Sequence, residues 1–141
     1  MKQYLDLVNE VLERGTRKEN RTGVDTISAF NINYSIDLNE GFPLLTTKEI
    51  SWKNIVIENL WFLSGDLHIG LLKKHGCKFW DHWADDEGYV PSAYGNFWRK
   101  FPIHGSDEYN DQVKYVLNTL KTNPNSRRMV ISAWAPGNAQ K

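Results

Sequence analysis

Hydrophobic residues recur along this chain with a helical spacing in three places. The apolar positions of residues 2–14 fall on one face of a helix that Gly15 caps at its C-terminus. Residues 113–120 repeat this pattern and stop before Pro124, where a helix has to end. A shorter helix is predicted over residues 67–74.

Two other segments favour extended structure. Apolar and other residues alternate strictly over residues 30–38, which is the period of a half-buried strand, and residues 129–134 form a short apolar run typical of a buried one.

Ser51–Leu63 predicts a central helix, because apolar residues occupy nearly every side of it. Helices and strands do not alternate regularly as βαβ units, so the α+β class is expected.

The central helix contains one ionisable group in its most apolar stretch. Glu58 is the lone carboxylate between Ile55 and Leu63. Helical neighbours three and four positions away would desolvate it, favour its protonated form and suit it to proton transfer near neutral pH. A structural carboxylate, bound to a buried arginine or a backbone amide, is the alternative interpretation.

Composition narrows the class of protein. The chain of 141 residues has the length of one small domain, and its formal charge of +0 gives no global field for nucleic acid or membrane partners. A single cysteine excludes an internal disulfide and fits a reducing compartment. No signal peptide or membrane-spanning run is present, so a cytoplasmic location is expected. The histidines and the cysteine lack zinc-site spacing, so no metal is expected.

Basic and aromatic residues supply further candidate sites. Arg127 and Arg128 open the second predicted strand and could clamp a phosphate or carboxylate, although most such pairs are solvated surface. Arg21 lies in a polar loop with a glycine turn and has the same two interpretations. Aromatic residues within 79–83 and 94–99 suit a flat heterocyclic ligand, and packing alone would use them too.

Taken together, these motifs resemble the N-terminal half of the thymidylate synthase family. The matching segments are Asn20–Gly23, Phe42–Lys48, Glu58–Gly65, Trp80–Asp85, Tyr94–Arg99 and Ser126–Arg128. The resemblance implies a mixed sheet flanked by helices, with residues 1–141 as the N-terminal part of a single catalytic domain. It also implies that a one-carbon unit from 5,10-methylenetetrahydrofolate is transferred to dUMP and reduced, giving dTMP.

The resemblance assigns roles to residues of this chain. Glu58 resembles the glutamate that manages proton transfers around the pyrimidine, and Arg21 resembles the mobile-loop arginine on the dUMP phosphate. Arg127 and Arg128 resemble a pair that crosses a homodimer interface to the partner's phosphate site. Three aromatic residues and one lysine complete the implied cavity: Trp80 and Trp83 against pyrimidine and folate, Tyr94 close to the nucleophile, and Lys48 near the folate tail. No membrane and no obligatory nucleic acid partner is implied.

Departures from the family pattern keep two alternatives open. The family's catalytic thiol lies in a Pro-Cys pair downstream, and the sequence stops at Lys141 before such a pair, so the chain alone is expected to be inactive. Cys77 matches no catalytic position, and a structural thiol is the expectation. Ala135 stands where the family has asparagine, which leaves a pyrimidine nucleotide hydroxymethylase open. A truncated fragment that binds nucleotide or dimerises is the other alternative.

Overall fold

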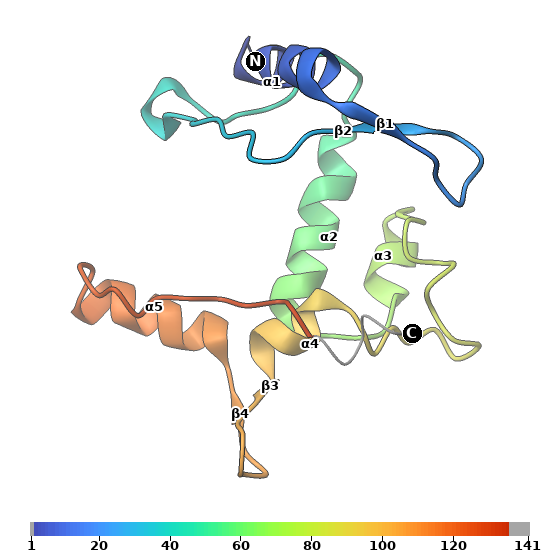
Figure 1. Ribbon diagram of the computed structural model, residues 1–141. Coiled ribbons are helices and arrows are strands. Elements are labelled where there is room, and N and C mark those ends of the chain that lie inside the picture. The colour runs from blue at the N-terminus through green and yellow to red at the C-terminus, as the bar shows by residue number, and fades with distance from the viewer. Residues whose placement is uncertain (1, 136–141) are drawn as a thin grey trace. The chain divides into compact units, whose positions relative to one another are not determined.

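The computed structural model describes residues 2–135. Lys141, at which the sequence analysis noted that the chain stops, lies outside the described residues. Helices and short strands alternate irregularly along the chain (Figure 1). The chain divides into two compact units, Met1–Ile50 and Ser51–Lys141, which are described in turn.

The first unit consists of one helix, one hairpin and a single 3-10 turn. Its elements are α1 (Lys2–Arg14), β1 (Thr16–Lys18), β2 (Thr26–Ser28) and η1 (Leu38–Glu40). The helix predicted for residues 2–14 is confirmed, and the Gly15 N–H closes it by donating to Val11 O at 2.9 Å. β1 and β2 pair antiparallel with Arg17 opposite Ile27. No described residue of this unit is fully buried.

The strand predicted over residues 30–38 is wrong. The described chain there is irregular until η1, and Phe30 remains 82% exposed. Alternation with period two becomes a strand only where a neighbouring backbone supplies hydrogen bonds and a layer covers the apolar face. Within the described first unit, residues 30–38 have no partner strand and no layer covers their apolar side chains. Their alternating pattern alone therefore does not form a strand.

The second unit is built mainly from helices. Its elements are α2 (Trp52–Ser64), α3 (Gly70–Lys74), α4 (Tyr94–Arg99), β3 (Phe101–Pro102), β4 (Tyr109–Asn110) and α5 (Gln112–Thr122). The predictions of a helix from Ser51 and another over 113–120 are confirmed, whereas the helix predicted from residue 67 begins at Gly70. The short helix α4 was not predicted. β3 and β4 form a two-stranded antiparallel hairpin.

The core of the second unit forms where α2 meets α3 and α4. Its buried members are Trp61, Phe62, Ile69, Leu72, Cys77, Val90 and Ala93. Gly65 ends α2 with φ 72°, a left-handed conformation that favours glycine. Of the α2 residues only Trp61 and Phe62 are buried, so the described residues of this unit do not cover the other apolar sides of the helix.

The second predicted strand, residues 129–134, is also not formed. The segment is extended but has no strand partner among the described residues, and Val130 is 65% exposed. The described chain therefore contains helices with two small antiparallel hairpins, which agrees with the α+β class. The mixed sheet that the resemblance implied is not formed by these residues.

Candidate active site

Glu58 and Trp80 form the polar centre of the candidate site. Glu58 projects from the second turn of α2, and Trp80 lies in the turn-rich segment after α3. The indole N–H of Trp80 donates to a carboxylate oxygen of Glu58 across 2.6 Å. Both side chains are partly buried, so this hydrogen bond is only partly open to competing water.

Aromatic rings surround this pair on the α2–α4 side. The ring of Trp80 meets those of Phe62 and Tyr94 edge-on, with centroids 5.7 and 6.1 Å apart, and Tyr94 also contacts Phe62 at 5.3 Å. Edge-to-face packing of this kind fixes ring orientations. The structure thus brings together three residues that the sequence analysis named separately: Glu58, Trp80 and Tyr94.

Close approach of α4 to α2 makes this arrangement possible. Gly95 is buried in the first turn of α4, and a methyl group added there would lie 2.5 Å from Phe62 O and 3.0 Å from its Cα. Only glycine therefore allows Tyr94 to reach the rings of α2. On the other side, the fully buried Trp61 donates its indole N–H to His68 O at 3.1 Å and lies 5.5 Å from the Trp80 ring.

The desolvation expected of Glu58 is only partial in this structure. The carboxylate is only half-buried, and the Trp80 indole satisfies one of its oxygens. The donor is neither the arginine nor the backbone amide that the structural alternative required. Glu58 is therefore held in place while still reachable from solvent, as a group that exchanges protons with a ligand or water has to be.

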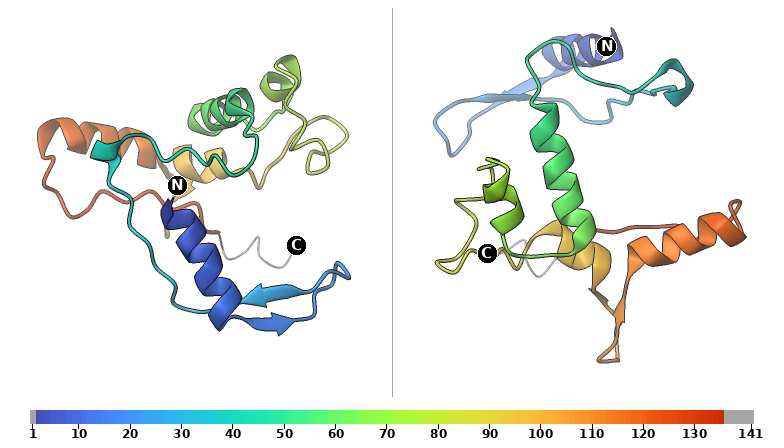
Figure 2. Two further views of the ribbon diagram at one scale, coloured as in Figure 1. Left: turned by 90° about the horizontal axis from the view of Figure 1, so that it is seen from above. Right: turned by 180° about the vertical axis from the view of Figure 1, so that it is seen from behind.

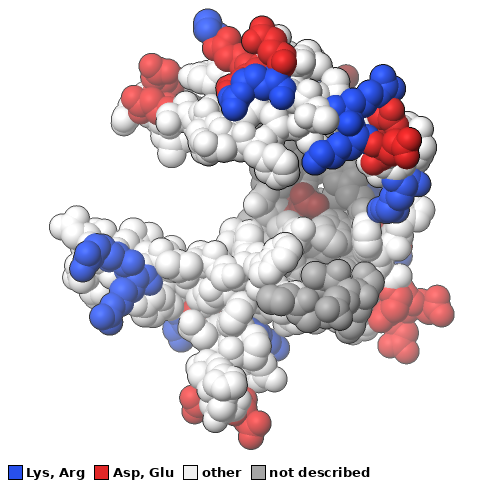
Figure 3. All heavy atoms as spheres, in the orientation of Figure 1, with Lys and Arg blue, Asp and Glu red and all other residues white. Residues whose placement is uncertain are grey.

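Other predicted site residues of the second unit lie apart from the Glu58 pair. Trp83 is 71% exposed and makes no ring contact with described residues, so it does not complete the aromatic wall here. Arg127 and Arg128 are exposed beyond the end of α5 and form no ion pair within residues 2–135. Lys121 is exposed nearby, and basic side chains gather at the end of α5 (Figure 3). Arg127 and Arg128 were expected to begin a strand, but they lie in an irregular turn.

Arg21 and Lys48 belong to the first unit. Arg21 is exposed in the β1–β2 loop, where Gly23 N–H closes a turn onto Asn20 O at 3.0 Å. The ion pair of Arg17 Nε with Asp25 Oδ2, at 2.6 Å, ties the two sides of this loop together. Lys48 is exposed in a bend. Both cations are therefore available to an anion from solvent.

Two residues that brace the second unit, Arg99 and Asp111, were given no role in the sequence analysis. Arg99 pairs with Asp111 at 2.8 Å and donates to Leu63 O at 2.7 Å, so it links α4 to the N-terminus of α5 and the end of α2. Asp111 caps α5 by accepting from the Lys114 N–H at 2.9 Å. Burial opposes ionisation of Asp111, but these hydrogen bonds and the Arg99 charge outweigh it and lower its pKa. Asp111 directly before the amphipathic helix is a typical N-cap residue, so its capping role could have been predicted from the sequence.

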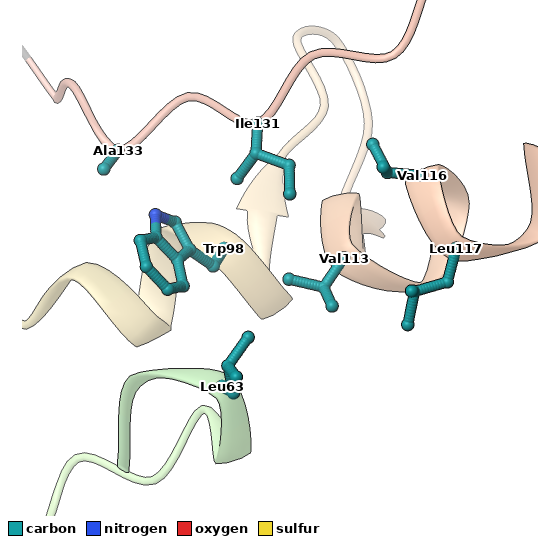
Figure 4. A pocket seen from close by; sticks show the side chains of 7 residues that line it. All are labelled: Leu63, Trp98, Val113, Val116, Leu117, Ile131 and Ala133. Carbon is teal, nitrogen blue, oxygen red and sulfur yellow. The ribbon is translucent and has the colours of Figure 1, made fainter. Parts of the chain in front are cut away.

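An apolar cavity of about 450 Å³ lies between α5 and the segment that follows it (Figure 4). Its walls are Leu63, Trp98, Val113, Val116, Leu117, Ile131 and Ala133. None of these side chains can ionise or coordinate a metal, so the cavity walls offer no acid–base or metal-binding group. No group of three or more metal-ligating side chains occurs among residues 2–135. Nor is any helix in that range long and apolar enough to cross a bilayer.

A partly buried carboxylate held beside aromatic rings is a class of site that can exchange protons and pack against a flat, ring-shaped ligand. Comparison with known proteins identifies the family to which the chain belongs. The family profile of thymidylate synthase matches residues 2–141. A curated thymidylate synthase of Haloferax volcanii is 48% identical over an alignment 154 positions long, which covers 95% of this chain and 45% of that protein. The chain belongs to the thymidylate synthase family, and it spans less than half the length of this relative.

Proposed function

We propose that this chain serves an enzyme that methylates dUMP to dTMP, with 5,10-methylenetetrahydrofolate as the donor of the one-carbon unit and the hydride. The observation that carries the proposal is the Glu58–Trp80 hydrogen bond beside Tyr94. It places a partly solvated carboxylate against aromatic faces, which suit a pyrimidine ring and a pterin-like ring. The curated relative is itself a thymidylate synthase, which favours methylation over hydroxymethylation.

Glu58 is the proposed proton-transfer residue. In the reaction that the resemblance implies, a thiolate adds to C6 of the pyrimidine and makes C5 nucleophilic toward the folate methylene. Protons then have to move at the pyrimidine, and Glu58 can carry them directly or through water because the Trp80 indole occupies only one of its oxygens. Tyr94 is proposed to lie close to the nucleophile. Cys77 is fully buried and is not proposed as that nucleophile.

Anion binding is proposed for the exposed arginines. Arg21 is proposed to contact the dUMP phosphate, and Arg127 and Arg128 are proposed to reach the phosphate site of a second subunit in a homodimer. Their exposure supports these roles, because a guanidinium already committed to an internal carboxylate could not clamp a phosphate. Trp80 is proposed to contact both dUMP and folate.

Folate binding is proposed for Trp83 and Lys48. Both are exposed, which leaves the indole face of one and the charge of the other free for a ligand with a flat ring and an acidic tail. A cytoplasmic location, with no membrane and no obligatory nucleic acid partner, completes the proposal. Residues 1–141 are proposed to form the N-terminal part of one catalytic domain.

The test is Glu58→Gln in the active enzyme that contains these residues. Glutamine keeps the shape and can still accept from Trp80, but it cannot exchange a proton. Turnover is expected to fall by roughly 10²- to 10⁴-fold, the usual scale for general acid–base assistance, with little change in dUMP affinity. The control is Glu108→Gln at an exposed position whose side chain makes no hydrogen bond to residues 2–135, which should leave turnover unchanged.

Product analysis and stability separate the alternatives. Formation of 5-hydroxymethyl-dUMP instead of dTMP would identify a hydroxymethylase. If Glu58 serves structure alone, Glu58→Gln should lower the free energy of unfolding and activity should follow the folded fraction. Near-normal turnover in a well-folded Glu58→Gln enzyme would end the catalytic assignment.

A further inference from the structure

We infer that Gln112 is a positioning residue for the phosphate clamp formed by Arg127 and Arg128. It is the first residue of α5, is only 6% exposed, and uses its side-chain amide on a distant backbone segment. Its Nε2 donates to Ser132 O at 2.8 Å, and its Oε1 accepts from Ser132 N–H at 2.8 Å. A neighbouring strand would give Ser132 the same two hydrogen bonds. Nε2 also donates to Phe97 O at 2.8 Å, which ties the amide to α4.

The arginines lie between this anchor and a second one. At the far end of α5, Ser126 N–H donates to Asn123 O at 3.0 Å, and Arg128 N–H donates to Ser126 Oγ at 3.2 Å. From this turn the chain runs back alongside α5 to Ser132 at the start of the helix (Figures 1 and 2). Residues 126–132, which contain both arginines, are therefore held by hydrogen bonds near the two ends of α5.

Within residues 129–135, the hydrogen bonds of Gln112 to Ser132 are the directional contacts that fix the register of this segment. Its apolar side chain Ile131 faces Val113 and Val116 across the cavity, and apolar packing of this kind is non-directional and tolerates sliding. A slip of one residue in an extended segment turns every side chain to the opposite face. The paired hydrogen bonds to Ser132 admit a single register for residues 129–132, so together with the Ser126 turn they fix where Arg127 and Arg128 lie at the end of α5.

This inference rests on the proposed function, because it assigns the arginines to the dUMP phosphate. The test is Gln112→Met in the active enzyme, a change that keeps side-chain length but removes all three hydrogen bonds. The KM for dUMP is expected to rise roughly tenfold, as for loss of one hydrogen bond to a charged group, with kcat changed less than about twofold. The matched control is Asn118→Leu on the exposed side of α5, which should leave both constants unchanged.

A double-mutant cycle shows whether Gln112 acts through the arginines. In an enzyme that carries Arg127→Ala and Arg128→Ala, Gln112→Met should raise the KM by less than about threefold, since no clamp remains to be misplaced. The same roughly tenfold rise in that background would overturn the inference. So would an unchanged KM in an active Gln112→Met enzyme with both arginines present.

A replacement variant and an amide-exchange measurement distinguish a loss of folding in Gln112→Met from a loss of arginine positioning. If Gln112→Met does not fold, Gln112→Glu replaces it in the cycle, because it keeps the acceptor for the Ser132 N–H and loses both donations. Without dUMP, amide exchange over residues 127–132 should be faster in the variant than in the control, and equal rates would contradict the anchor. Failure of the unmodified enzyme to make dTMP would overturn the proposed function instead.

Discussion

The carboxylate of Glu58 and the indole of Trp80 are separated by 22 positions in the sequence, yet they meet at 2.6 Å. Each could be singled out locally, Glu58 by its apolar neighbours and Trp80 by its aromatic block. Their hydrogen bond could not be derived from periodicity, because the chain between α3 and α4 is turn-rich and carries no repeating pattern. Only the resemblance placed the two residues in one cavity.

Trp80→Phe tests this pair directly. Phenylalanine keeps an aromatic wall against Phe62 and Tyr94 but removes the N–H donor to Glu58. A hydrogen bond to a charged group contributes about 1.5–3 kcal/mol, so kcat is expected to fall by roughly tenfold or more as the carboxylate loses its fixed position. Steady-state kinetics would show the loss.

The same substitution at Trp98 is the control for Trp80→Phe. Trp98 also packs edge-on against Phe62, at 5.7 Å, but its indole makes no hydrogen bond within the described residues. Trp98→Phe should therefore spare kcat. Equal losses at Trp80 and Trp98 would assign the effect to ring size and contradict a role for the N–H.

At the scale of elements, helices were predicted well and strands were not. The helices over residues 2–14, 51–63 and 113–120 depend on local spacing and caps, which the sequence contains. The strands expected over residues 30–38 and 129–134 depend on partners elsewhere in a fold, which local pattern does not specify. The helix α4 was missed because its aromatic residues surround a glycine and show no apolar periodicity.

The N-terminus of α5 gives a prediction about pH and stability. Because hydrogen bonds and Arg99 lower the pKa of Asp111 in the folded chain, its ionisation stabilises the fold above the ordinary aspartate pKa. This contribution is lost as the pH falls through the lowered pKa. Asp111→Asn should reduce the free energy of unfolding by up to about 1 kcal/mol at pH 7. The difference from wild type should shrink below about pH 4.

Urea unfolding at pH 7 and at pH 3 would measure this difference for Asp111→Asn. Asp107→Asn is the matched control, since Asp107 is an exposed acid of the same unit and forms no ion pair among the described residues. It should be near neutral at both pH values. A deficit for Asp111→Asn that grows on acidification would contradict the sign of the pKa shift.

The crossing of α4 over α2 gives a second prediction at this scale. In Gly95→Ala the new methyl group would overlap Phe62 O, so the helices have to separate. Overpacking of this kind costs about 1–3 kcal/mol, and Tyr94 should move away from Trp80 as well. Thermal unfolding together with kcat would record both effects. Ser92→Ala, at an exposed position nearby, should change neither.

For the molecule as a whole, buried residues are unevenly distributed between the two compact units. All residues of the hydrophobic core belong to Ser51–Lys141, whereas the described part of Met1–Ile50 contains no fully buried side chain. Burial is the main source of resistance to local opening. The two units should therefore differ in stability when the polypeptide is studied by itself.

Hydrogen exchange of the 141-residue polypeptide would test this difference. Amides of α1 and of the β1–β2 hairpin should exchange before those at the C-terminal end of α2 around Trp61 and Phe62. In the active enzyme, a single calorimetric transition would support the proposal that residues 1–141 belong to one catalytic domain. Two separate transitions would favour the compact units as independent domains.

The contact between Trp61 and Trp80 also has an optical consequence. Their ring centroids are 5.5 Å apart and their planes are tilted by 57°, an arrangement in which the excited states of two indoles interact. Circular dichroism in the ultraviolet should therefore contain a split band that arises beside Glu58. Any ligand that turns Trp80 would change this band, so occupancy of the site could be followed without a label and without turnover.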